Sequence, residues 1–132
     1  MNEVYKFLLP DDLLSFLKKE GEKNLLTEIC GLLSFENGYF FYKPMKNISS
    51  ENNFFKISPK DYLDFITNHK CFCIFHTHIS GNEKPSEIDI LNARNCCKAY
   101  LIYSVITEKF SLFEPQTKDY DVSIIEPIKL KV

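Results

Sequence analysis

Two histidines and one aspartate are the residues of this 132-residue chain whose types and spacing suit metal chemistry. His76 and His78 stand two positions apart at the end of an apolar stretch, and side chains two apart on a β-strand point to the same face of a sheet. Asp89 follows in the first turn of a helix that we expect to begin after Ser86. A loop over residues 79–85 would fold this carboxylate back toward the histidines. Two nitrogens and one carboxylate oxygen would then converge on one point.

This set of ligands is typical of catalytic zinc. Three protein ligands leave the fourth position of a tetrahedral zinc ion open, whereas structural zinc sites are usually closed by four protein ligands. A zinc ion of this kind lowers the pKa of water to about 7, but hydrolysis still needs a base to take the proton. We expect Glu28 to be that base, because it opens the most continuously apolar strand, where an ionised carboxylate is costly unless it is solvated or used.

Each of these motifs has an ordinary structural explanation when it is taken alone. A His-x-His pair is more often two polar residues at a strand end, and Ser86 and Asp89 have the spacing of a helix capping box. Glu28 alone suits a solvated strand terminus. The joint pattern of two His, one Ser and one Asp at fixed spacing should arise by chance on the order of once in several thousand chains. The combination therefore favours the functional interpretation.

A rival metal site can be drawn from the same segment, because the run from Cys71 to His78 contains two cysteines and two histidines. This set superficially resembles a structural Cys2His2 zinc centre. Strand alternation argues against it, because Cys71 and Cys73 should lie on one face and the two histidines, with Phe72, on the other. The thiols are therefore expected to pack in the core.

Helix-start signals predict three helices that would position these groups. The first should span residues 11–20 behind an Asp cap and end at Gly21. The second should begin at Pro59 after the N-cap Ser58, and the third after the N-cap Ser86. The apolar positions of the second and third helices are Tyr62, Leu63, Phe65, Ile66, Ile88, Leu91 and Cys96.

Short apolar and aromatic runs predict the strands. Asn37-Gly38 between two such runs is the strongest short hairpin signal, and a polar loop is expected over residues 46–53. The expected strands span residues 28–35, 39–42, 71–76, 100–106, 110–113 and 120–125. Since no internal repeat or linker is visible, the chain over residues 1–132 is predicted to be one α/β domain, with a single mixed sheet flanked by about three helices.

Composition narrows the partners and the compartment. The net charge of −2 argues against a nucleic-acid partner, and no apolar run reaches the roughly 20 residues of a membrane span. No secretory signal is visible at the start of the chain. Five cysteines, an odd number, favour reduced thiols over a disulfide framework. We therefore expect a cytoplasmic protein.

Taken together, two motifs resemble a known signature. The Glu-x-x-Gly motif at residues 28–31 and the His-x-His-x7-Ser-x-x-Asp motif at residues 76–89 resemble those of the JAMM metalloprotease family, also called MPN+ or Mov34/JAB, in its compact prokaryotic and phage form. The similarity covers roughly residues 28–114. The family's second motif usually reads His-Ser-His-Pro, and here Thr77 replaces the serine and Ile79 the proline.

This resemblance implies a cytidine-deaminase-like α/β fold and a zinc-dependent isopeptidase or peptidase. It would cut bonds at the C-terminal tail of ubiquitin or a ubiquitin-like protein. By the same resemblance His76, His78 and Asp89 are the zinc ligands. Glu28 is the general base, and Ser86 helps to stabilise the tetrahedral oxyanion.

Two other functions stay open within the same resemblance. One is a non-catalytic MPN-like interaction module, although scaffold members typically lack a ligand and this chain keeps them all. The other is a component of phage tail assembly. The loops at residues 46–53 and 107–109 are too short to be long substrate-gripping insertions, so we also expect weak substrate binding or dependence on an activating protein partner.

Overall fold

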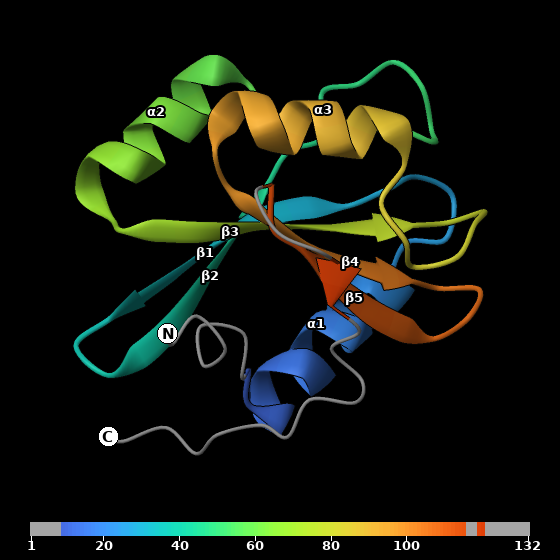
Figure 1. The fold of residues 1–132 in the computed structure, drawn as a ribbon, viewed down its shortest axis with the longest axis horizontal. Helices are drawn as coiled ribbons and strands as arrows, with labels where there is room; N and C mark the ends of the chain where they lie inside the picture. The colour runs from blue at the N-terminus through green and yellow to red at the C-terminus, as the bar shows by residue number, and fades with distance from the viewer. Residues whose placement is uncertain (1–8, 116–118, 121–132) are drawn as a thin grey trace.

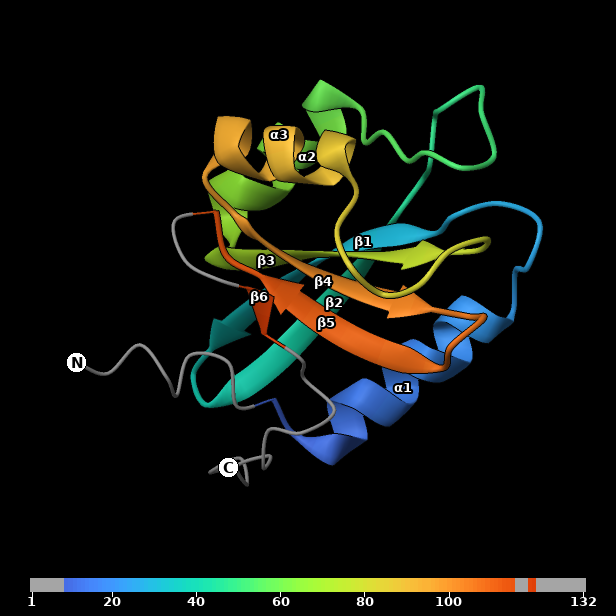
Figure 2. The same cartoon turned by 45° about the vertical axis from the view of Figure 1, so that its right-hand side comes forward.

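One mixed sheet organises the computed structural model, which describes residues 9–115 and 119–120. Its six strands lie in the order β2-β1-β3-β4-β5-β6. Helix α1 covers one face of the sheet, and helices α2 and α3 cover the other (Figure 1). The turned view in Figure 2 shows the same three layers. The prediction of an α/β fold with a mixed sheet and three helices is confirmed.

Helices and strands are mixed along the chain. In chain order they are α1 (Asp11–Glu22), β1 (Cys30–Glu36), β2 (Tyr39–Met45), α2 (Pro59–Asn68), β3 (Cys71–His78), α3 (Glu87–Cys96), β4 (Ala99–Ser104), β5 (Lys109–Phe113) and β6 (Asp119–Tyr120). Within the described residues, none of these helices has both the length and the apolar character required to cross a bilayer. Of the strand expected over residues 120–125, only its first residue lies inside the described part of the chain.

Strand β3 is the central element for the site. It pairs antiparallel with β1 on one side and parallel with β4 on the other, and α3 forms the crossover from β3 to β4. The loop that leaves β3 therefore runs over the carboxyl end of the strand to the start of α3. In open α/β sheets this edge is where ligands commonly bind.

Two apolar clusters hold the layers together, one on each face of the sheet. The cluster on the α1 face contains Leu9, Leu17, Leu33, Cys73, Phe75, Leu101 and Tyr103 among its buried residues. The cluster under α2 and α3 contains Leu32, Phe65, Cys71, Ile74, Ala93, Tyr100 and Ile102. The central strands contribute to both clusters, so β3 is buried on both faces.

The predicted hairpin turn and the predicted start of the second helix, which depend on contacts between residues close in sequence, are confirmed. Asn37 and Gly38 have φ angles of 55° and 84°, as a two-residue hairpin turn with both central residues left-handed requires. Ser58 caps α2, its hydroxyl accepting a hydrogen bond from the Asp61 N–H at 3.2 Å, and Pro59 is the first helical residue.

Helix α1 begins at residue 11 as predicted, but its predicted Asp cap and its predicted end at Gly21 are wrong. Gly21 does not end the helix but lies in its last turn, where a Cβ atom would come 2.8 Å from Cγ2 of Thr77. The glycine is therefore needed for close packing of α1 on β3. At the other end Pro10 is the N-cap, without a side-chain hydrogen bond, and Asp11 lies in the first turn, where a negative charge suits the helix dipole.

The buried faces of two helices also differ from expectation. Leu63 on α2, and Ile88 and Leu91 on α3, are exposed. On α3 the buried residues are instead Asp89 and Ala93, four positions apart on one face of the helix. Because Asp89 and Ala93 occupy the face toward the sheet, Ile88 and Leu91 lie toward solvent.

A β-bulge interrupts the expected alternation of side chains between the two faces at the start of β3. Leu33 pairs with Cys73, but Ser34 pairs with Cys71, so Phe72 is an extra residue in the ladder. A bulge of this kind shifts the faces of the residues before it. Cys71 accordingly packs under α2 and α3, and Phe72 packs with the α1 cluster, the reverse of the prediction. Beyond the bulge, alternation toward the histidines is regular.

Candidate metal centre

The carboxyl end of β3 and the first turn of α3 bring three candidate ligands together. Nε2 of His78 lies 2.9 Å from Oδ2 of Asp89, and Nε2 of His76 lies 3.2 Å from Oδ1 of the same carboxylate. One nitrogen from each histidine and one carboxylate oxygen all lie within 4.8 Å of one another. Two ligands of one zinc ion, each about 2.0–2.2 Å from it, are at most about 4.4 Å apart. The observed cluster is thus close to the size that one ion requires.

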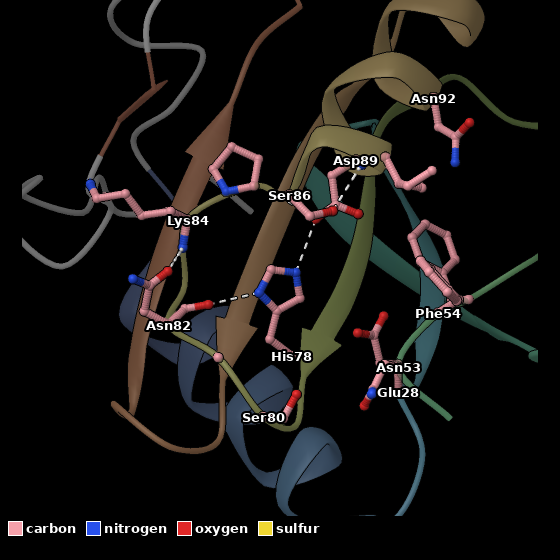
Figure 3. A pocket seen from close by; sticks show the side chains of 14 residues that line it. Glu28, Asn53, Phe54, His78, Ser80, Asn82, Lys84, Ser86, Asp89 and Asn92 are labelled. Carbon is pink, nitrogen blue, oxygen red and sulfur yellow. Dashed lines mark hydrogen bonds and ion pairs between the residues drawn. The ribbon is translucent and has the colours of Figure 1, made fainter. Parts of the chain in front are cut away.

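A capping box positions the aspartate. The Ser86 hydroxyl accepts a hydrogen bond from the Asp89 N–H at 3.1 Å, and the Ser86 N–H donates to Oδ2 of Asp89 at 3.0 Å. The structural interpretation of this Ser-x-x-Asp motif is therefore confirmed. It does not compete with a role at the site, because the box orients the carboxylate toward His78 (Figure 3).

The orientation of His78 is set by the loop that follows it. Its Nδ1 lies 2.7 Å from the carbonyl oxygen of Asn82, and a carbonyl can only accept, so Nδ1 carries the hydrogen. This leaves the lone pair of a neutral ring on Nε2, which faces Asp89. Metal-binding histidines are commonly held in this way by a hydrogen bond from the other ring nitrogen.

His76 is fully buried and has an unusual environment. The Phe55 ring stacks on it at 4.3 Å between centroids, and Tyr100 meets it edge-on at 5.4 Å. Its contact with Asp89 is close but not directed as a hydrogen bond, so among the described residues neither ring nitrogen has a hydrogen-bond partner. Unsatisfied buried polar groups are rare in native proteins. The residues present therefore fit a bound metal ion, which would occupy the lone pair of this ring.

The charges of His76 and Asp89 agree with that fit. Burial lowers the pKa of His76 more than Asp89 raises it, so this ring is neutral, as a ligand must be. Burial would raise the pKa of Asp89, but its contacts with His76 and His78 outweigh burial and hold the pKa well below its usual range. Burial likewise opposes the charged form of His78, whose pKa is nevertheless raised by Asp89 and by the Asn82 carbonyl.

Glu28 reaches the site from a different part of the chain. It lies just before β1 and is only 6% exposed. Its N–H donates to the Asn52 carbonyl at 3.2 Å, and its own carbonyl accepts from the Asn47 side chain at 2.8 Å. Burial raises the pKa of the Glu28 carboxyl to about 8, with Asp89 adding to the shift and His78 opposing it.

A cavity of about 430 Å³ connects Glu28 with the cluster. Figure 3 shows the Glu28 carboxylate pointing into this space from the side opposite His78. The lining includes Glu28, Phe54, His78, Asn82, Ser86 and Asp89. The structure thus brings together all five residues singled out from the sequence, with His76 buried beneath the cavity and the others along its wall.

Other residues behave differently from the sequence interpretation. Gly31, the last residue of the Glu-x-x-Gly motif, lies against the Tyr42 ring on the α1 face and not at the cavity. Phe55 and Asn82 were not anticipated as parts of the site. Two adjacent aromatic residues, Phe54 and Phe55, directly after a polar loop could have indicated a role for Phe55. Asn82 contributes its backbone carbonyl, which no residue pattern reveals. Within the described residues, no cysteine joins the ligand cluster.

Comparison with known proteins bears on the fold only. No protein-family model matches the chain, and no curated protein matches it either. The chain is similar to the solution structure of protein DSY2949 from Desulfitobacterium hafniense, a structural genomics target. The two share 21% identity with a TM-score of 0.64, over 93% of this chain and 91% of that chain. At this identity the likeness shows a common fold and nothing of the activity.

Proposed function

We propose that this protein is a zinc-dependent JAMM-type hydrolase that cuts isopeptide or peptide bonds at the C-terminal tail of a ubiquitin-like protein. The observation that carries the proposal is the buried His76 ring. It lacks hydrogen bonds and lies within 4.8 Å of two further ligand atoms. A polar group left in this state has a cost, and an ion bound by Nε2 would remove the part that belongs to that nitrogen.

The donor set favours zinc over calcium and magnesium. His76, His78 and Asp89 offer two imidazole nitrogens and one carboxylate oxygen. Calcium and magnesium prefer sites built from oxygen alone, whereas zinc binds nitrogen and oxygen ligands in catalytic sites with one open position. The cavity beside His78 would give substrate access to an ion held by these residues.

The positions of Glu28 and Ser86 beside the same cavity support the proposal. When bound, zinc supplies a Lewis acid and lowers the pKa of water toward 7. In the proposed reaction the Glu28 carboxylate removes the proton of the attacking water and later delivers a proton to the leaving amine. The Ser86 hydroxyl, whose oxygen accepts from the Asp89 N–H, keeps its own hydrogen for donation to the oxyanion.

The buried position of Glu28 suits the same role. A general base works best when its pKa lies near the operating pH, and burial moves the pKa of this carboxyl upward to about 8. A bound dication would lower that value again, because it favours the ionised form. Burial and a bound dication together would bring the pKa of Glu28 to a value at which the carboxyl can act as a base at neutral pH.

The proposed location is the cytoplasm, and the proposed partners are proteins. The five cysteines are all free thiols, as a reducing compartment favours. The loop between β2 and α2 forms one wall of the cavity through Asn53, Phe54 and Phe55, and it carries no long insertion that could grip a folded substrate. Dependence on an activating protein partner is therefore part of the proposal.

The test combines metal analysis with cleavage. Purified protein should contain about one zinc ion per chain. It should cleave at least one member of a panel of ubiquitin-like fusions and branched isopeptide substrates, and a chelator should stop the cleavage. Folded protein without stoichiometric zinc or a comparable transition metal would contradict the metal site, and cleavage that a chelator leaves unchanged would contradict the mechanism. Bound zinc without cleavage of any substrate would favour the interaction module or the tail-assembly component.

A further inference from the structure

Thr77 lies between the two histidines and points to the opposite face of the sheet. It is completely buried. Its hydroxyl oxygen accepts a hydrogen bond from the Ile29 N–H at 3.0 Å, and its own N–H donates to the Ile29 carbonyl at 3.1 Å. Ile29 is the neighbour of Glu28, so this residue connects the strand of the histidines with the segment of the base.

The bond from Ile29 departs from ordinary strand pairing. In an antiparallel pair, closely bonded residues exchange two backbone hydrogen bonds. Here one of the two is made to the Thr77 side chain in place of its carbonyl, and the regular register of β1 with β3 stops at Cys30 and His76. The chain before Cys30 therefore leaves the ladder while still being held to β3.

Hydrogen bonds on both sides of Glu28 hold its backbone in place. On one side Thr77 holds Ile29 through two hydrogen bonds. On the other, the Glu28 N–H and carbonyl bond to Asn52 and Asn47 in the loop after β2. The direction of the Glu28 side chain into the cavity follows from these two attachments.

The two branches of the Thr77 side chain have separate partners. Its methyl carbon lies against Gly21 of α1, where a Cβ atom would come within 2.8 Å. A β-branched side chain held in this way has little freedom about its first torsion, so the contact with α1 keeps the hydroxyl turned to Ile29. The methyl is a packing group and the hydroxyl is an attachment for Ile29.

We propose that the Thr77 hydroxyl is a positioning group that holds the base Glu28 in register with the metal ligands. This inference rests on the proposed function, since it needs Glu28 to act as base. Thr77 itself touches neither metal nor substrate in this scheme. It acts only through Ile29.

Two substitutions separate the hydroxyl from the methyl. Thr77→Val keeps the branched shape and removes the hydroxyl, whereas Thr77→Ser keeps the hydroxyl and removes the methyl. We expect Thr77→Val to bind zinc at wild-type stoichiometry but to lose about tenfold or more in kcat with little change in KM, because only the placement of the base is disturbed. Thr77→Ser should keep kcat within about twofold of wild type.

Backbone amide exchange gives a readout that does not depend on activity. In NMR hydrogen exchange, the Ile29 amide should exchange at least about tenfold faster in Thr77→Val than in wild type or Thr77→Ser. Both variants should have lower melting temperatures, one through an Ile29 N–H without acceptor and the other through lost packing on Gly21. A purely structural role would make kcat follow stability in both variants, and such parallel losses would overturn the inference.

Different measurements reveal a failure of the inference and a failure of the proposed function. Wild-type protein that holds no zinc and cleaves nothing overturns the proposed function; the Ile29 exchange rates then decide whether the hydroxyl holds this segment. Equal exchange in wild type and Thr77→Val overturns the inference whatever the activity. If Thr77→Val does not fold, Thr77→Ser still decides, because a tenfold loss of kcat in a variant that keeps the hydroxyl overturns the proposal.

Discussion

Two histidine–carboxylate contacts of nearly equal length lie near opposite ends of β3, and they differ in how exposed their side chains are. Nδ1 of His69 lies 3.0 Å from Oε2 of Glu36 beside the amino end of the strand, and Nε2 of His78 lies 2.9 Å from Oδ2 of Asp89 at its carboxyl end. The side chains of the first pair are 36% and 32% exposed, and those of the second 12% and 7%. Distance alone therefore does not distinguish the two.

What distinguishes them is burial and the presence of a third group. His69 is the C-cap of α2, stacks on Phe65 and has one carboxylate partner, so this half-exposed contact has small energetic value. At the other end a second ring, His76, faces the same Asp89 without a directed hydrogen bond. A buried group of three with an unsatisfied member suits a bound ion, whereas in the half-exposed pair each side chain already has its partner.

The sharpest way to break this comparison is to remove the carboxylate of each pair. Asp89→Asn should lose zinc affinity by more than about 100-fold and lose cleavage with it, because one charged ligand is gone while the amide can still accept from Ser86. The matched control Glu36→Gln should bind zinc as the wild type does. Titration with zinc against a competing chromophoric chelator measures both. Wild-type affinity in Asp89→Asn would remove the proposed centre.

The next largest effect concerns the base. Glu28→Gln should keep about one zinc ion per chain and lose roughly 10²–10⁴-fold in kcat, the usual contribution of a general acid–base group. Metal analysis and single-turnover cleavage on the same preparation test this together. Full activity in Glu28→Gln would exclude Glu28 as the base while leaving the ligand cluster unaffected.

A third effect is one of stability in the metal-free protein. The folded-state pKa of Glu28, about 8, lies above its ordinary value of 4.5, so the folded state binds this proton more tightly than the unfolded state. The wild type should therefore lose stability relative to Glu28→Gln as the pH rises from about 4.5 to about 8, and by a few kcal/mol at about 1.4 kcal/mol for each pKa unit.

Urea unfolding of the metal-free wild type and Glu28→Gln at several pH values measures this difference. Glu36→Gln is the matched control, because its carboxylate is half exposed and its replacement should not produce the same upward trend in relative stability. A stability difference between wild type and Glu28→Gln that stays constant from pH 5 to about pH 8 would contradict the raised pKa.

The parts of the fold that could be predicted are those with local causes. The Asn37-Gly38 turn, the start of α2 and the cap of α3 each involve contacts within about four residues, where backbone geometry leaves few alternatives. The errors occurred where another element decides. Gly21 stays helical because β3 packs against it, and Phe72 changes face because of a bulge against β1.

The same division holds at the site. From the sequence alone, two-residue alternation placed His76 and His78 on one face, and the capping motif placed Asp89 at the start of a helix; both follow from the fixed repeat of strand and helix. Only the tertiary structure decided that Glu28 faces them, that Phe55 covers His76 and that the Thr77 hydroxyl holds Ile29, 48 residues away in the chain. Such contacts depend on which strands pair and how layers pack, and local geometry does not determine either.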